Sequence, residues 1–478
     1  SDNWIVFWEP GYGEDPSVLA DGNYRINIDG LLATAEKAFV FYADSLKFIK
    51  RGKSKTDDYK MVIRLRYTRD WEASGSGVDD LIGLLTLTAW SGQVGGHTMA
   101  HEVGHCFQYQ VHCDNGNQNG WMYGFGVNTS GGNGWWEQCA QWQAFKVFPE
   151  LQFTDNRFLL YLTTAHKHIL HETPRYDNYF VHDYFTFRHG MNIIGRLWNE
   201  SIRPEDPVEA YKRITGITQQ QFNDEMYDRA ARFATWDIPA LKAAGTSRIN
   251  SRPQAKMINA GNGFWRIDPT LTPENYGYNV IKLNAPVKAS TVYAFFEGKA
   301  GMDGYRNNYS TQAGWRYGFV ALLNNGSRVY SEMRSASYSA PSDTLRFFCP
   351  DNCKQLWLVV SGAPATHWRH AWDDDDTNDE QWPYQVKFNN TNLLGQQNIV
   401  NSLDATADLG LIVYSEQNKL IINELPLDAH VRIFSATGHK VAEQNPGTSS
   451  TAVELNQGVY IVSVISNGTQ YVQKVVVR

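Results

Sequence analysis

The sequence predicts a chain of three domains, an N-terminal α+β domain followed by two all-β domains. Three observations carry this prediction. Amphipathic helical segments dominate residues 97–245, short alternating strands dominate 262–393, and a second set of such strands fills 411–478. A polar stretch at 394–408 separates the two sets of strands. The 478 residues are enough for roughly two to four domains of ordinary size.

The composition is that of a folded protein with no sign of a nucleic-acid partner. Lys and Arg number 43 against 50 Asp and Glu, a net charge of −7, and 42% of the residues are hydrophobic. This balance excludes a disordered chain and gives no support to nucleic-acid binding. No apolar run reaches the roughly 18–20 residues that span a bilayer, so we expect no transmembrane segment. Aromatic residues make up 13% of the chain, which favours an extracellular surface that handles polymers.

The first predicted domain covers residues 1–250. It opens with an amphipathic helix at 27–50 and strands at 59–68 and 81–90, followed by a Gly-rich break at 92–96. Helical periodicity then predicts segments at 97–110, 134–148, 155–172, 178–201, 207–214 and 218–245.

The other two domains are predicted from strands separated by Gly, Asn, Pro and Ser turns. After a change of composition at Ser251-Arg252-Pro253, residues 258–395 carry alternating runs such as TVYAFFE and QLWLVVSG, which predict an antiparallel β-sandwich. Residues 409–478 repeat the pattern in a segment of the size of a small immunoglobulin-like β-sandwich.

The sharpest chemical signal is the segment His101-Glu102-Val103-Gly104-His105, which has the pattern HExxH. On a helix, residues i and i+4 share a face, so His101 and His105 can present imidazole nitrogens to a single zinc ion. Glu102 then stands beside them, where it can take a proton from water as a general base. Zinc acidifies water and polarises a substrate carbonyl, which is the chemistry that peptide hydrolysis needs at neutral pH.

A third protein ligand is expected from Glu137. This residue lies in the segment WWEQCAQW, 32 residues after His105 (137 − 105). The intervening residues 111–134 are rich in Gly and Asn and are long enough to bring a second helix against the first. Ala140 would let the two helices pack closely. A His, His, Glu set leaves one position open, as a catalytic zinc site requires.

Other third ligands remain open at this point. The extended motif in which a third His follows the pair is absent, because Gln108 stands where Gly is required and Val111 where the third His belongs. His112 is one residue out of register with that motif. His112 and Asp114 are the alternatives to Glu137.

A donor for the oxyanion of the transition state is sought in the segment 176–184, which is dense in Tyr and His. Within it we select Tyr179 and His182. The group of His166, His168, His171 and Glu172 could mimic a metal site, but His168 and His171 are expected on a solvated helix face.

An acidic run, Asp373 to Asp376 with Asp379, is flanked by Trp372 and Trp382. Such a run is usually a solvated loop. Clustered carboxylates would also suit calcium, so Ca²⁺ is a possible second cofactor besides Zn²⁺.

The HExxH segment, the WWEQCAQW segment and the surrounding residues 1–250 resemble a gluzincin-type zinc metallopeptidase of a secreted bacterial family, most of whose members are uncharacterised. The stretch 356–388 resembles the β-domain that follows the peptidase unit in such proteins. Residues 411–478 resemble a type IX secretion system sorting domain, through NKLIINELPLDAHVRIFSATGHKV, LNQGVYIVSV and YVQKVVVR. The resemblance implies a zincin-like fold, the type IX machinery as partner, and export through the periplasm to the outer surface of a Gram-negative cell.

The leading hypothesis is therefore a secreted or surface zinc endopeptidase that acts on proteins or glycoproteins. A surface module that binds glycans or proteins on a zincin-like scaffold is the alternative. The many Trp residues favour that alternative, since sugars stack on aromatic faces, whereas Glu102 counts against it, because a pure binder needs no base. A metal-dependent hydrolase of other bonds is the third hypothesis.

Overall fold

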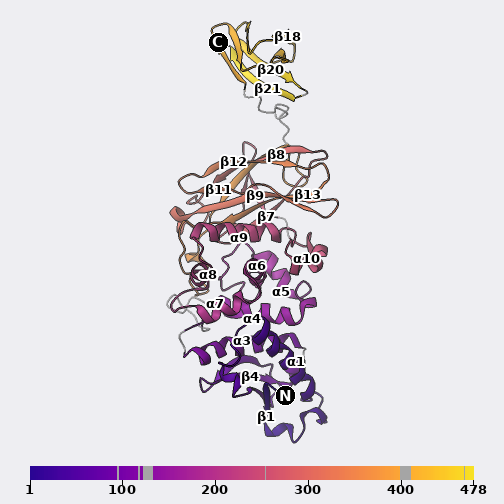
Figure 1. The fold of residues 1–478 in the computed structure, drawn as a ribbon, viewed down its shortest axis with the longest axis vertical. Coiled ribbons are helices and arrows are strands. Elements are labelled where there is room, and N and C mark those ends of the chain that lie inside the picture. The colour runs from indigo at the N-terminus through magenta and orange to yellow at the C-terminus, as the bar shows by residue number, and fades with distance from the viewer. Residues whose placement is uncertain are drawn as a thin grey trace. The chain divides into compact units, whose positions relative to one another are not determined.

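The computed structural model describes residues 1–93, 96–116, 119–121, 133–252, 255–398, 411–467 and 469–477. These residues form two compact units, Ser1–Gln396 and Gln397–Arg478 (Figure 1). In the described part of the chain, no helix has the length and apolarity needed to cross a membrane.

The first unit begins with a four-stranded sheet in the order β1 (Trp4–Trp8), β2 (Met61–Arg66), β4 (Ile82–Thr88) and β3 (Ala73–Val78). The first three strands are parallel, and β3 pairs antiparallel with β4 at the edge. Strands β2 and β4 were expected from their apolar patterns. Strand β3 has the sequence ASGSGV, whose small residues carry no apolar alternation, so its pattern predicts nothing.

Helix α3 (Gly96–Asn115) lies directly on this sheet and carries the HExxH segment. Its approach is close because glycines face it. A Cβ at Gly75 would stand 2.0 Å from the carbonyl oxygen of Glu102, and one at Gly77 would stand 1.9 Å from the ring of Tyr109. On its other side α3 packs against α4 (Asn133–Val147), and α1 (Ile28–Val40) lies alongside.

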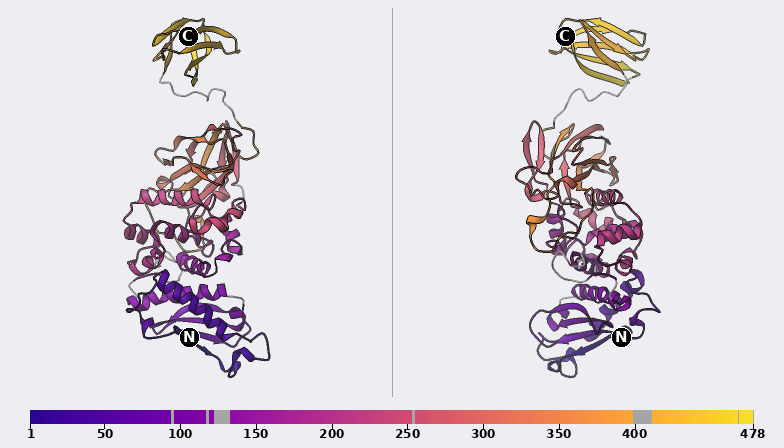
Figure 2. Two further views of the ribbon diagram at one scale, coloured as in Figure 1. Left: turned by 45° about the vertical axis from the view of Figure 1, so that its right-hand side comes forward. Right: turned by 90° about the vertical axis from the view of Figure 1, so that its left-hand side faces the viewer.

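Further helices form a layer between the N-terminal sheet and a β-sandwich (Figure 1, Figure 2). Two of them, α8 (Pro207–Thr215) and α9 (Gln219–Phe233), begin at capping boxes, which are formed by Asp206 with Glu209 and by Thr218 with Gln221. The expected helix at 155–172 ends early, at Thr164. The helices of the layer are α5 (Asn156–Thr164), α6 (Phe180–His189), α7 (Ile193–Glu200), α8 (Pro207–Thr215), α9 (Gln219–Phe233) and α10 (Pro239–Gly245).

The β-sandwich consists of two five-stranded sheets, as the alternating runs predicted. One sheet contains β7 (Tyr278–Leu283), β9 (Gly314–Leu323), β10 (Arg328–Tyr330), β11 (Arg334–Ser337) and β13 (Cys353–Gly362). The other has the order β12 (Ser342–Cys349), β8 (Ser290–Gly298), β14 (Tyr384–Asn389), β6 (Phe264–Ile267) and β5 (Met257–Gly261). Their facing side chains form one core.

The sheet that contains β13 is apolar on both faces. Leu356, Leu358 and Val360 enter the core of the sandwich, whereas Trp357 and Val359 belong to the core of the helical layer. Helix α9 lies across this outer face and contacts β7, β9 and β13 (Figure 1). The expected boundary near residue 250 therefore falls inside a single compact unit, because burial of that apolar face joins the two parts.

The second unit is a small β fold with its own core. One sheet has the order β15 (Ile412–Glu416), β16 (Lys419–Asn423) and β19 (Ser450–Glu454). The other has the order β18 (Lys440–Gln444), β17 (His430–Ser435), β20 (Gly458–Ser466) and β21 (Thr469–Val477). Leu420, Ile422, Val431 and Val462 are among the buried residues of its core.

Replacement of Gly277 by Ala should destabilise the first unit by about 1–3 kcal/mol, because the added Cβ would lie 1.9 Å from the backbone oxygen of His166, which cannot rotate away. Chemical denaturation followed by tryptophan fluorescence measures the change. Gly22→Ala is the matched control, since nothing lies within 4 Å of its Cβ. Equal stability of the two variants would contradict this account of the packing.

Candidate metal centre

Three side chains from two helices meet at the buried side of a cleft. His101 and His105 project from α3, and Glu137 projects from α4. The Nε2 atoms of the two imidazoles are 3.1 Å apart, and each is 3.2 Å from Oε2 of Glu137. At most 9% of each of these side chains is exposed. The HExxH segment and the expected third ligand are thus brought together at one point.

The spacing of these three atoms fits a metal ion. A tetrahedral zinc ion with bonds of about 2.0–2.1 Å has ligand atoms roughly 3.3–3.4 Å apart. The observed edges of 3.1–3.2 Å are close to that value. Burial lowers the pKa of His105, but the adjacent carboxylate of Glu137 outweighs burial and holds that pKa at about 9. The two imidazoles lower the pKa of Glu137 against the effect of burial. The carboxylate of Glu137 therefore stabilises a positive charge, either a proton or a metal ion, between itself and the two imidazoles.

Gln108 determines which nitrogen of His105 faces the centre. The Nε2 amide of Gln108 donates to the backbone oxygen of Trp136 at 2.9 Å, which points its Oε1 at Nδ1 of His105, also at 2.9 Å. Nδ1 of His105 therefore keeps its proton, and Nε2 is the nitrogen at which a metal ion would take the place of a proton. The indole of Trp136 stacks on the same imidazole with ring centroids 5.1 Å apart. Sequence reasoning gave Gln108 no role beyond the departure from the extended motif.

Glu102 is held beside the two imidazoles by the edge strand. The backbone N–H of Gly75 donates to its Oε2 at 2.8 Å. Only 8% of Glu102 is exposed, and the residue lines the same cleft as the three candidate ligands. A carboxylate in this position can accept a proton from a molecule bound in the cleft.

The cleft has a volume of about 700 Å³. The edge strand β3 forms one wall, and the segment that follows α4 forms the other. Tyr176 lies beside the three candidate ligands, and its ring centroid is 5.9 Å from that of His101. The guanidinium of Arg157 lies 4.5 Å from the centroid of the Tyr176 ring. A larger cavity of about 850 Å³ is lined by Lys47, Arg51 and Asn199 among others, and its described lining residues include no such group of ligands. The remaining polar and aromatic residues of the cleft include Trp71, His97, Tyr109, Gln141 and Asp155.

The selected oxyanion donors, Tyr179 and His182, do not reach the cleft. The hydroxyl of Tyr179 is buried and donates to the backbone oxygen of Gln152 at 2.8 Å. His182 is buried between the indoles of Trp135 and Trp142, and burial lowers its pKa to about 3. Both sit on or beside α6, whose apolar neighbours enclose them, so their roles lack geometric support. Tyr176 of the same segment lines the cleft instead.

The alternative third ligands also point elsewhere. Nε2 of His112 lies 3.1 Å from the backbone oxygen of Trp121, and Asp114 accepts hydrogen bonds from the backbone of Lys55 and the side chain of Gln110. Much of the expected turn 111–134 lies outside the described residues. The helices cross where a Cβ at Gly104 would stand 3.1 Å from Cα of Ala140, in agreement with the expected close packing.

His168 and His171 were expected on a solvated helix face, and both are buried instead. Helix α5 ends before them, and the loop that follows β13 covers them. That loop carries the acidic run. Asp375 caps a short 3₁₀ turn there, and Asp373 accepts a hydrogen bond from Asn378. Asp379, by contrast, is buried against His171 and His370.

Each of the two units matches the model of a known protein family. The model of a family of unknown function, DUF6055, matches residues 1–395. The chain belongs to this family. A second model, of a secretion system C-terminal sorting domain, matches residues 415–478. The DUF6055 unit is thus followed by a type IX sorting domain, which directs a protein to the cell surface or the extracellular space. No curated protein matches the sequence.

Solved structures show distant likenesses only. One of them is the M60 catalytic domain with the CBM51-1 and CBM51-2 domains from Clostridium perfringens ZmpB, which is 11% identical to this chain. The alignment covers 93% of this chain and 64% of that chain, with a TM-score of 0.20. PorZ, a surface component of the type-IX secretion system of Porphyromonas gingivalis, is 12% identical, with 33% and 30% covered and a TM-score of 0.14. The alignments span less than two thirds of each of these proteins. At such TM-scores neither structure defines the fold of the DUF6055 unit.

Gln108→Met should weaken zinc binding by about 10- to 100-fold, because Nδ1 of His105 loses the partner that fixes its proton. Competition with a chelator of known affinity measures the change. Gln110→Met is the matched control: Gln110 is equally buried on α3, but it binds Gly83 and Asp114, away from the centre. The same loss of affinity in both variants would argue for a general effect on the helix.

Proposed function

We propose that the DUF6055 unit is a zinc-dependent endopeptidase with a zincin-like fold, which cleaves proteins or glycoproteins outside the cell. The observation that carries this proposal is the set of three ligand atoms 3.1–3.2 Å apart, with Glu102 beside them in one cleft. The sorting domain supports the location of the activity.

His101, His105 and Glu137 would hold the zinc ion. When bound, zinc supplies a Lewis acid that polarises a carbonyl and lowers the pKa of water to about 7. Glu102 would accept the proton of the attacking water on Oε1, since Oε2 is already bound to the N–H of Gly75. The same carboxyl group would then pass the proton to the leaving amine.

The edge strand supports a polypeptide as substrate. Strand β3 pairs on one side with β4, and residues Ala73, Ser74, Gly75 and Ser76 line the cleft. An extended chain can add to such an edge through main-chain hydrogen bonds, which hold it regardless of its side chains. This arrangement would place a peptide carbonyl next to the three candidate ligands.

Tyr176 would stabilise the oxyanion. Its ring stands over His101, and the guanidinium of Arg157 packs on the ring and pairs with Asp177 at 3.3 Å. A phenol next to a cation is a good hydrogen-bond donor to a developing negative charge. Tyr176 would therefore act together with zinc at the carbonyl oxygen.

A glycan-binding role is the second candidate. Trp71 lines the cleft and is 50% exposed, as a sugar-stacking residue would be. Glu102 argues against binding alone, because a buried carboxylate is costly and a binder gains nothing from it. One aromatic ring at the rim also suits a peptide or a glycoprotein substrate.

Zinc content and hydrolysis test the proposal together. Glu102→Gln should retain zinc and lose about 10²- to 10⁴-fold in kcat on a cleavable protein or peptide library, because the amide cannot accept the proton of water. Glu137→Ala should lose the zinc ion of this centre and the activity with it. Metal content is measured by elemental analysis after dialysis into metal-free buffer.

The outcomes separate the hypotheses. Glycan binding that persists in Glu102→Gln, with no cleavage of proteins by the unmodified protein, would favour the binding module. Zinc content that does not change in Glu137→Ala would remove Glu137 as a ligand and with it this proposal.

Tyr176→Phe should lower kcat by about 10²- to 10³-fold and leave KM and zinc content nearly unchanged, because the hydroxyl acts on charge that develops only in the transition state. Tyr109→Phe is the matched control. Tyr109 lines the same cleft, and its hydroxyl donates to Asp80 at 2.9 Å, whereas the ring of Tyr176 lies next to that of His101. Steady-state kinetics on one peptide compare the two variants; an equal, small effect in both would rule out Tyr176 as the donor.

A further inference from the structure

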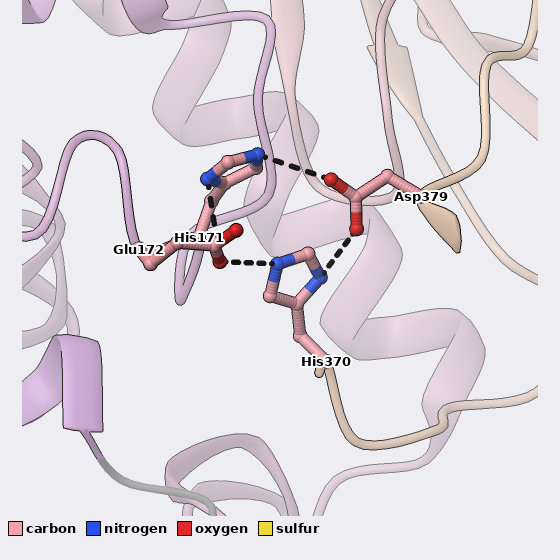
Figure 3. Close-up of side chains that lie close together, drawn as sticks. All are labelled: His171, Glu172, His370 and Asp379. Carbon is pink, nitrogen blue, oxygen red and sulfur yellow. Dashed lines mark hydrogen bonds and ion pairs between the residues drawn. The ribbon is translucent and has the colours of Figure 1, made fainter. Parts of the chain in front are cut away.

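A second group of potential metal ligands lies at the junction of the helical layer and the β-sandwich. His171 and Glu172 come from the segment between α5 and α6, and His370 and Asp379 come from the loop between β13 and β14 (Figure 3). One potential ligand atom from each of the four lies within 4.8 Å of every other. The side chains are 0–4% exposed, so the cluster is closed to solvent.

In this cluster imidazoles and carboxylates alternate, with each carboxylate between the two rings (Figure 3). Oε2 of Glu172 lies 3.2 Å from Nε2 of His370 and 3.5 Å from Nδ1 of His171. Oδ2 of Asp379 lies 3.1 Å from Nε2 of His171, and Oδ1 lies 3.5 Å from Nδ1 of His370. These distances are somewhat wider than those of the first centre, so binding of an ion would draw the side chains together by a fraction of an ångström.

One buried oxygen in this cluster lacks a hydrogen bond. Oδ2 of Asp379 accepts none from any residue that the structure describes, although it faces His171 at 3.1 Å. A buried carboxylate oxygen that has an ion pair but no well-aligned hydrogen bond is only partly compensated for its burial. The ring of His370 is itself fixed, by stacking on His168 with centroids 4.7 Å apart and a 7° tilt. A cation between the rings would satisfy the oxygen.

Buried carboxyl groups crowd the surroundings. Glu274 and Glu380 are both buried, and Glu274 lies close to Glu380 and Asp379. Burial and the charges of Glu380 and Asp379 raise the pKa of Glu274 to about 8, even though Arg306 pairs with it at 3.2 Å, so Glu274 binds a proton at neutral pH rather than adding negative charge. The ammonium of Lys167 lies 2.7 Å from Nε2 of His171 and 3.2 Å from Asp376. Burial lowers the pKa of His370, but Glu172 and Asp379 outweigh burial and raise it to about 9, so positive charge also gathers in the cluster.

We propose that His171, Glu172, His370 and Asp379 form a second metal site, which takes a divalent transition ion of the zinc class. Two nitrogen and two oxygen donors suit zinc, cobalt or manganese, whereas calcium takes oxygen ligands. Four protein ligands without access for solvent are typical of a structural site rather than a catalytic one. The proposal replaces calcium at the acidic run with a transition ion that uses only Asp379 from it.

The ion would fasten the loop 363–383 of the sandwich to the segment 165–179. That segment also carries Tyr176, which lines the cleft. The second site would therefore hold one wall of the cleft in place from behind. The bound ion would be structural, and its ligands would not touch the substrate.

Metal content of four full-length proteins tests the proposal. After loading with zinc and dialysis, we expect two equivalents in the unmodified protein, one in Glu137→Ala, one in Asp379→Asn and none in the double variant. Asp379→Asn is chosen because it preserves the shape of the side chain. Asp374→Asn is the matched control, since Asp374 is exposed in the same loop and lies outside the cluster; it should retain two equivalents.

Cobalt supplies a second measurement. In Glu137→Ala, one equivalent of Co²⁺ should give a visible absorption band and raise Tm, and neither change should occur once Asp379→Asn is added. Lys167→Met should strengthen binding in the same background, because a competing cation is removed.

The pattern of losses distinguishes the two sites. Equal metal content in the unmodified protein and Asp379→Asn, with none in Glu137→Ala, would overturn the second site and leave the first intact. If the unmodified protein binds two equivalents of zinc, and Asp379→Asn lowers this content but Glu137→Ala does not, the result would support the second site and contradict the first. Destabilisation by Lys167→Met without any metal uptake would mean that the ammonium itself balances the cluster, and would also overturn the proposal.

Discussion

The close approach of helix α3 to its neighbours is the contact on which the rest of the site depends. On one side, Gly75 and Gly77 of β3 leave room for the backbone of α3. On the other, Gly104 meets Ala140 of α4. Because side chains are small on both sides, the backbone N–H of Gly75 can donate to Glu102. For the same reason, Glu137 can reach both imidazoles. Larger residues at these positions would push α3 away from β3 and α4, and would separate Glu102 from Gly75 and Glu137 from the His pair.

That contact also explains why charge can be buried here. A carboxylate in the interior is unfavourable unless it is paired and hydrogen bonded. Glu137 faces two imidazoles, and Gln108 and Trp136 hold one of them in a fixed tautomer and orientation. The polar groups of the centre are therefore arranged before any ligand arrives. Preorganisation of this kind is what makes a metal site selective and what allows a nearby base to act without rearrangement.

The sequence predicted the parts that follow from local pattern. Strand β2, helix α3 and the strands of the sandwich have apolar periodicity, and HExxH with Glu137 has a spacing that one helix pair can satisfy. Strand β3 was missed because ASGSGV has no apolar pattern, although its glycines are what α3 requires. His182 and Tyr179 were expected at the cleft but are buried in the core. A run dense in Tyr and His has the same sequence pattern in a core as in a cleft, so the sequence does not distinguish the two. His370 could not be linked to His171, since nearly 200 residues separate them in the chain and only tertiary packing brings them together.

The outer face of the sandwich links these observations. Because β13 is apolar on both sides, the sandwich must be covered, and α9 with the segment after α5 covers it. Backbone hydrogen bonds then join the segment to the sandwich: the N–H groups of Glu274 and Tyr278 donate to the oxygens of His166 and Ala165 at 2.9 Å. The same segment continues through His171 and Glu172 to Tyr176 at the cleft. Burial of one apolar sheet face therefore joins the sandwich and the helical layer into one unit. The same burial fixes the position of a residue at the candidate active site.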